Sequence, residues 1–184
     1  MDYVYFPLDG LVSLLVTLHN GESVEAGVVG NEGLVGVSVV LGADGATNQA
    51  LVQNTGSALK MNSKDLKVLI GNGGPLHDLL LRYTHTLFTQ ISQTAACNRV
   101  HALNERLARW LLLTHDRVRN DKFELTHEFL ARMLGTRRAA MSPRAALARA
   151  APIAVLTSFS SSGGGSTAGS PNDSIHSSRV HPAV

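Results

Sequence analysis

The chain has 184 residues, a net charge of +2 and ordinary hydrophobic content, which suits one sizeable core or two small domains. Its single cysteine, Cys97, excludes a disulfide framework and a cysteine-ligated metal cluster. No apolar run approaches the ~18–20 residues of a membrane span, and the acidic start is unlike a signal peptide. A cytoplasmic protein with no membrane partner is therefore expected.

Charge is distributed unevenly along the chain. Residues 1–98 carry four Lys or Arg against eight Asp or Glu, whereas residues 99–150 carry eleven against five. A phosphate-binding surface therefore belongs on the second segment.

The first part of the chain shows the signals of antiparallel strands. Short apolar runs are rich in aromatic and β-branched residues, and Asn20-Gly21 is a strong hairpin signal. Spaced glycines from Gly30 to Gly45 fit the corners of a rolled sheet. We expect a jelly-roll-like domain, with strands at residues 3–6, 11–18, 23–29, 49–53 and 58–61.

The longest helical pattern runs from about Pro75 to Val118. One face carries residues spaced by three and four, as in a coiled-coil seam: Leu76, Leu80, Tyr83, Leu87, Ile91, Thr94 and Asn98. The seam is narrow and turns polar toward its end, so it fits either a dimer interface or packing on the roll. A dimer helix is the favoured interpretation. After it, Leu107, Trp110 and Leu111 are expected to be buried in a helix that supports the next element.

A helix-turn-helix is predicted over residues 125–142. Thr126 is a good N-cap for the first helix, and Gly135 supplies the positive φ that a sharp corner requires. Arg137 and Arg138 open the second helix, where backbone N–H groups and guanidinium groups can meet phosphates together. The second helix of such a motif enters the major groove of DNA.

The last residues have another composition. Ser and Gly dominate residues 158–178, and no Lys follows Lys122. Such a segment cannot bury enough apolar surface to offset its ordering entropy, so a disordered tail is expected. The expected organisation is residues 1–74 for the roll, 75–118 for the dimerisation and connecting helices, 119–151 for the helix-turn-helix, and 152–184 for the tail.

Together these features resemble the Crp/Fnr family of bacterial transcription regulators. The motifs that carry the resemblance are Val4–Ser13, Gly30–Gly36, Gln93–Arg99, Glu105–Leu111 and Leu125–Arg138. The resemblance covers about residues 3–142 and implies an α+β fold: an antiparallel β-roll as sensor domain, a long dimerisation helix and a C-terminal winged helix-turn-helix. It implies a sequence-specific DNA-binding regulator and no enzyme, with double-stranded DNA, a second copy of the chain and RNA polymerase as partners.

The resemblance also implies roles for individual residues. Arg138 would read a base edge, with guanine the best bidentate partner. Thr126, Thr136 and Arg137 would hold phosphates, and Ser142 completes the set of DNA-binding candidates. The other interpretation of the two arginines is a solvated basic helix start.

The candidate effector pocket departs from the family pattern, and the roll looks short at its N-terminus. Nucleotide-binding members place a glutamate and an arginine–serine pair at positions that fall on Gly36, Val37, Ser38, Asn48 and Gln49. No fixed cation is then available for a cyclic phosphate, which argues against cyclic AMP. No cofactor is predicted, and the pocket binds another effector or none.

The resemblance ends after about Ser142, so the wing is missing. Pro143 falls inside the second helix, at a cost of ~3 kcal/mol if that helix stays straight. The Ala, Arg, Ser, Gly and Pro bias that follows is typical of GC-rich coding read out of frame. It favours a reading-frame change near residues 141–144.

Two other functions stay open. The chain could dimerise without binding DNA, which the tail favours and the basic segment 99–150 opposes. A remote alternative is a cupin-like metalloenzyme, but the roll offers only His19, Glu22 and Glu25 around one hairpin, without a His-x-His pair. No metal site is predicted.

Overall fold

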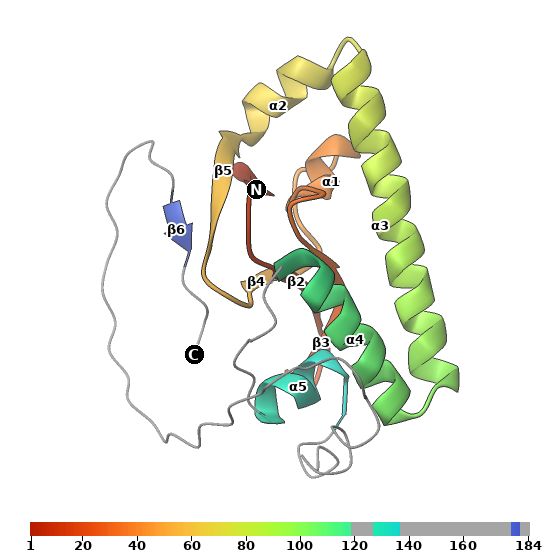
Figure 1. Ribbon diagram of the computed structural model, residues 1–184. Coiled ribbons are helices and arrows are strands. Elements are labelled where there is room, and N and C mark those ends of the chain that lie inside the picture. The colour runs from red at the N-terminus through yellow and green to blue at the C-terminus, as the bar shows by residue number, and fades with distance from the viewer. Residues whose placement is uncertain (119–126, 137–177, 181–184) are drawn as a thin grey trace.

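The structure is a computed structural model that describes residues 1–118, 127–136 and 178–180. Within these ranges, strands form two small antiparallel sheets, and helices cover one side and one end of them (Figure 1). The predicted combination of a strand roll, a long helix and a helix-turn-helix is confirmed. The second helix of the corner and nearly all of the tail lie outside the described residues.

Each sheet is built around a central strand. In the first, β5 (Gly56–Asn62) pairs with β1 (Tyr3–Pro7) and with β6 (Ser178–Val180). In the second, β2 (Val12–Thr17) pairs with β3 (Ser23–Val29) and with β4 (Gln49–Val52). The five strands predicted in the roll are confirmed within two residues at every end. The sixth, β6, comes from the segment predicted to be a disordered tail.

Local signals explain where several elements turn. The β2–β3 hairpin closes through Gly21, which has φ +84°, with the Leu18 N–H donating to the Glu22 carbonyl at 2.7 Å. Asn62 caps α2 (Ser63–Ile70) by accepting the Lys64 N–H at 2.8 Å. The short helix α1 (Val37–Val40) follows Gly36 and was not expected.

The predicted helical stretch 75–118 is two helices. Helix α3 (Pro75–Val100) begins with a proline in its first turn and ends at His101, whose backbone is extended. Helix α4 (Leu103–Val118) then begins beside the Glu105 carboxylate, which accepts the Ala102 N–H at 2.9 Å. The two-residue link turns the chain back toward the strands, where α5 (His127–Met133) also lies (Figure 1).

Apolar packing divides into clusters on the two sides of the roll. Helix α3 covers one side with Leu80 and Leu87, both 5% exposed, and its Tyr83 ring fits against Gly33, where any Cβ would collide with it. The clusters beneath α3 consist of Val4, Leu34, Val39, Val40, Leu66, Ile70 and Leu80, and of Leu14, Val29, Val35 and Leu87.

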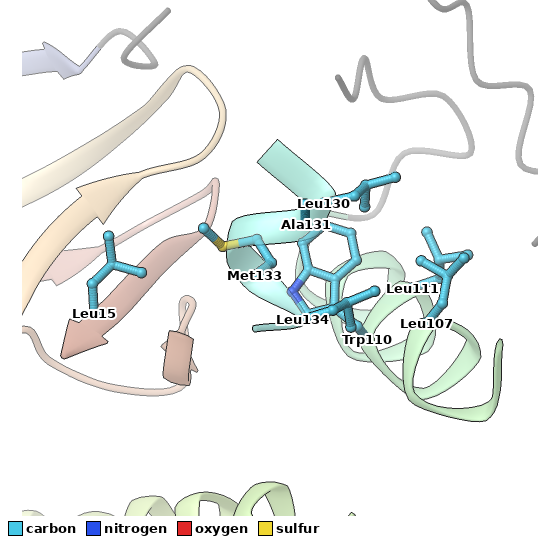
Figure 2. Close-up of a cluster of buried hydrophobic side chains, with 8 residues drawn as sticks. All are labelled: Leu15, Leu107, Trp110, Leu111, Leu130, Ala131, Met133 and Leu134. Atoms are coloured by element: carbon cyan, nitrogen blue, oxygen red, sulfur yellow. The ribbon is translucent and has the colours of Figure 1, made fainter. Parts of the chain in front are cut away.

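A third cluster joins the helix-turn-helix to the roll (Figure 2). Figure 2 shows Met133 of α5 lying between Leu15 of strand β2 and the indole of Trp110 on α4. Leu107, Trp110 and Leu111 are at most 9% exposed, which confirms their predicted burial. The complete cluster is Leu15, Leu107, Trp110, Leu111, Leu130, Ala131, Met133 and Leu134.

Candidate nucleic-acid interface and its docking on the roll

The predicted corner after α5 has the hydrogen bonds of a Schellman motif. Gly135 has φ +57°, the Thr136 N–H donates to the Ala131 carbonyl at 2.9 Å, and the Gly135 N–H donates to the Arg132 carbonyl at 3.3 Å. These bonds satisfy carbonyls that the last turn of α5 would otherwise leave unpaired. The chain therefore leaves α5 in a fixed direction, as a helix-turn-helix requires.

Helix α4 supports this corner from below. The Trp110 and Phe129 rings meet edge to face, with centroids 6.1 Å apart. The Arg106 guanidinium donates to the Leu134 carbonyl at the end of α5 and, through Nε, to Asn98 Oδ1 of α3 at 3.0 Å. One cation thus ties α4 to both neighbouring helices.

The contact between these helices and the roll is centred on a buried carboxyl group. Glu25 of β3 is 6% exposed and accepts the Trp110 indole N–H at 2.9 Å. Its other oxygen accepts the Ser13 hydroxyl at 2.6 Å and the Gln53 amide at 2.9 Å. Burial raises the pKa of Glu25 from 4.5 to about 7, although all three donors favour the ionised form.

A small cavity of about 30 Å³ lies beside Glu25, between β3, α3, α4 and α5. That volume holds one or two water molecules. Charged and polar side chains contribute much of its wall, namely Glu25, Gln90, Thr94, Asn98, Arg106 and Arg109, and the Cys97 thiol also lines it.

Comparison with known proteins agrees with this arrangement. Residues 105–145 match the model of the Crp-like helix-turn-helix domain. Three solved structures superpose with TM-scores of 0.59 to 0.62 at 14 to 17% identity, and cover 76 to 80% of this chain. The chain has the Crp/Fnr fold.

The three structures with this fold come from different bacteria. They are a protein assigned to the Crp/Fnr family from Eubacterium rectale, the c-di-GMP-responsive global regulator CLP of Xanthomonas campestris, and a CRP-family regulator of Thermus thermophilus. The chain spans 65% of the first and about three quarters of the other two (73 and 74%). No curated protein matches the sequence significantly.

Only one predicted DNA-binding residue lies in the described part of this Crp/Fnr fold. Thr136 is half-buried and follows Gly135 at the corner. Thr126, Arg137, Arg138 and Ser142 lie outside the described residues, so their roles stay predictions.

The predicted dimerisation seam contacts parts of its own chain. Leu80, Tyr83, Leu87 and Ile91 pack on the roll, and the Tyr83 hydroxyl donates to the Leu34 carbonyl at 3.2 Å. Thr94 Oγ1 accepts an Arg109 N–H at 3.2 Å, and Asn98 accepts from Arg106. Of the predicted seam, Leu76 faces solvent, as do four apolar residues of α3 outside the seam: Leu79, Leu81, Phe88 and Val100.

The candidate effector residues occupy two separate elements and do not line the cavity beside Glu25. Gly36 precedes α1 with φ +114°, and Ser38 of α1 donates to the Met1 sulfur at 3.9 Å. Gln49 begins β4 opposite Leu15, and Asn48 accepts the Thr47 hydroxyl at 3.2 Å. An effector pocket at these positions stays a prediction.

The central role of Glu25 was missed at the sequence level, where it appeared only as a weak metal ligand. A usable signal exists, because Glu25 lies within the apolar strand Ser23–Val29, where it is opposite the buried Leu15. A carboxylate on a buried strand face needs specific donors.

Neither a metal centre nor a membrane span emerges from the described residues. Across residues 1–118, 127–136 and 178–180, no three His, Cys, Asp or Glu side chains come together to hold a metal ion. In those same ranges, no helix combines the length and apolar character needed to cross a bilayer.

Proposed function

We propose that this chain is a transcription regulator of the Crp/Fnr type, which binds duplex DNA through the helix-turn-helix that begins with α5 and has no enzymatic role. The observation that carries the proposal is the Gly135 corner, which lies inside the segment matching the Crp-like domain and two residues before Arg137. The positive balance of residues 99–150 supports it, because duplex binding depends on neutralising phosphates.

In this proposal some polar residues around the corner contact a base and others contact the DNA backbone. Arg138 reads a base edge, and Arg137 holds a phosphate. Thr126, Thr136 and Ser142 add contacts to the DNA backbone that fix the position of the second helix.

We further propose that the protein is a cytoplasmic homodimer assembled along α3. Because the predicted seam from Leu80 to Ile91 is covered by the roll, the second copy would meet the solvent-facing residues of the same helix. Phe88 is the largest of these and is 68% exposed. Two copies would then present two corners to successive half-sites of an operator. RNA polymerase is the expected further partner, and the roll is the expected place for an effector.

Fluorescence anisotropy with labelled duplexes tests DNA binding. The duplexes are a sequence selected from a random pool by the wild-type chain and a scrambled version. Binding is expected to weaken steeply with salt. Arg138→Ala should lose affinity mainly for the selected sequence, by roughly 1–3 kcal/mol, whereas Arg137→Ala should weaken both duplexes alike.

Arg82→Ala is the matched control, since it removes the same charge from an exposed position on α3. Equal losses on both duplexes for Arg138→Ala would contradict base reading. Binding that does not respond to salt would contradict the proposed function itself.

The second candidate is a chain that dimerises but does not bind DNA. Pro143 favours it, because a proline would interrupt the second helix. A dimer in sedimentation, together with no salt-dependent duplex binding, would select this candidate.

A further inference from the structure

The helix-turn-helix unit, defined as α4, α5 and the corner through Thr136, is attached to the rest of the chain in two different ways. Its covalent link to α3 is short, with an extended His101 between the two helices. A change at one or two backbone angles of such a link can reorient everything after it. Beyond the hydrogen bonds of Arg106 and Arg109 to α3, its contact with the roll therefore decides whether the unit stays docked.

The polar centre of that contact is the Glu25 cluster. Through Trp110 it holds α4, and through Ser13 it reaches Met133 of α5, whose sulfur lies 3.4 Å from the Ser13 hydroxyl. Glu25, Ser13 and Gln53 all belong to the roll. The bonds to Trp110 and Met133 cross from the roll to the helix-turn-helix unit. The bonds of Ser13 and Gln53 to Glu25 hold its carboxyl group in place for that contact.

The Ser13 hydroxyl has only one proton to donate. When Glu25 is ionised, that proton goes to the carboxylate at 2.6 Å and not to the Met133 sulfur. When Glu25 is protonated, its own O–H can donate to Ser13, and Ser13 can donate onward to Met133. The protonation state of Glu25 thus decides whether the Ser13 hydroxyl bonds to α5, whereas the Gln53 amide lies 3.9 Å from the same sulfur in both states.

The lack of water around the carboxylate also favours release of the helix-turn-helix unit when Glu25 is ionised. The adjacent cavity of about 30 Å³ holds one or two water molecules, too few for the hydration shell that an ionised carboxylate has in water. Separating the helix-turn-helix unit from the roll would admit the missing water.

We propose that the Glu25 carboxyl is a proton-operated latch that holds the helix-turn-helix unit on the roll of its own chain when protonated and releases it when ionised. The charged and titratable groups that border Glu25 are Arg106 and Arg109 from α4 and the Cys97 thiol from α3. The contacts from β2, the segment after β4 and α5 are made by Ser13, Gln53 and Met133, which carry no charge. Arg109 opposes the release by attracting the ionised carboxylate, but burial outweighs it.

The sign of the pH effect follows from the raised pKa. Glu25 titrates near 7 in the docked state, and near its ordinary 4.5 once water reaches it. Docking is therefore fully stable below about pH 4.5, weakens about tenfold per pH unit up to about pH 7, and then levels off at roughly 300-fold below its starting value.

The chain carries two built-in reporters for a test. Trp110 is the only tryptophan and donates directly to Glu25, so its emission wavelength reports the latch. Cys97 is the only cysteine, is 4% exposed and lines the cavity, so its reaction with a maleimide reports separation.

The decisive variant is Glu25→Gln in the full-length chain, which keeps the size of the side chain and cannot ionise. Dividing the wild-type labelling rate by the variant rate at each pH cancels the intrinsic pH dependence of the thiol. This ratio is expected to rise about thirtyfold from about pH 5.5 to about pH 8.5, while Trp110 emission shifts to longer wavelength in the wild type alone. A flat ratio would overturn the proposal.

The matched control is Glu32→Gln. Glu32 is a partly exposed carboxylate that pairs with Arg117 of α4 across the same contact, 2.7 Å away. In this variant Cys97 should react with the maleimide with the wild-type pH dependence. If the substitution abolishes that dependence, the assignment to Glu25 fails.

The wild-type chain decides the question even if Glu25→Gln does not fold. Its Trp110 emission should shift between about pH 5.5 and about pH 8.5 while the amides of Tyr5 and Val35, which pair across the roll, keep their protection from hydrogen exchange. An emission shift accompanied by loss of amide protection would mean global unfolding and would overturn the latch. The absence of any emission shift would overturn it too.

Discussion

The roll carries helices on two sides, and the two contacts are made differently. Under α3 the contact is apolar and closely fitted. Leu80 and Leu87 are buried, and Tyr83 fits against Gly33. Burial raises the pKa of Tyr83 above its ordinary value, so this phenol stays neutral at physiological pH. The strength of this contact should not depend on pH there.

Under α4 and α5 the contact surrounds a carboxyl group with a polar cluster and a small cavity. Burial of apolar area stabilises both contacts, but only the second contains a group whose charge changes near neutrality. The difference suggests a permanent attachment for α3 and a conditional one for the helix-turn-helix unit. Four substitutions can break or sharpen this comparison.

The largest effect is expected beneath α3. Leu34 is 1% exposed and belongs to the cluster that holds Leu80. Leu34→Ala should lower the free energy of unfolding by roughly 2–5 kcal/mol, because it removes buried methyl groups and leaves a cavity. Urea denaturation should give the same loss at about pH 5.5 and about pH 8.5. The control is Leu41→Ala, at a leucine that is 62% exposed and should change stability little.

Trp110→Phe removes a donor from the Glu25 carboxyl while keeping an aromatic ring. The expected loss is roughly 1–3 kcal/mol, and it should be larger below neutral pH, because the indole N–H meets Glu25 only while the helix-turn-helix unit is docked. Circular dichroism during urea denaturation measures it at both pH values.

Tyr3→Phe, at a position 40% exposed on β1, is the control for removing a polar group from an aromatic side chain. A loss for Trp110→Phe that is no larger at low pH would mean that the indole is held by packing alone. The two contacts of the roll would then be alike.

Gly135→Ala tests the corner where the helix-turn-helix unit meets the roll. An alanine there is strained by φ +57° and brings its Cβ to 3.0 Å from a Val24 methyl of β3, so a loss of about 1–2 kcal/mol is expected. Gly73→Ala is matched, because it has φ +74° and open space around it. A larger loss at Gly135 than at Gly73 measures the contact with Val24, and equal losses would mean that the corner is not pressed against β3.

Local signals explain how much of this fold could be predicted. The Asn20-Gly21 turn and the bounds of β3 depend on near neighbours in sequence, and both were predicted correctly. The Gly135 corner was also predicted correctly, since the left-handed backbone that ends a helix favours glycine at that one position. A separate helix from Leu103 was predicted as well, although residues on both sides of His101 favour helix, and the Glu105 carboxylate caps its start.

Partners distant in sequence could not be predicted. The spacing of Leu80, Tyr83 and Leu87 identifies an apolar face, but the same pattern serves a second copy or the chain's own roll. Likewise, the partners of Arg106 and Glu25 depend on how α4 folds back. DNA contacts were assigned to Arg137 and Arg138 from their place after the corner and by resemblance, and these roles stay predictions.

The smallest effect is expected at the rim of the second contact, where the Arg117 guanidinium meets Glu32 at 2.7 Å. Glu32→Gln should cost less than about 1 kcal/mol, because the pair is partly exposed and water screens it. The loss should vanish in about 1 M salt. Urea denaturation at low salt and at about 1 M salt measures this. Arg117→Ala is a poorer test, since its guanidinium also donates to the Leu113 carbonyl at 3.0 Å. A loss that persists in high salt would place Glu32 beside Glu25 as a buried determinant of docking, and the latch would then depend on two carboxyl groups.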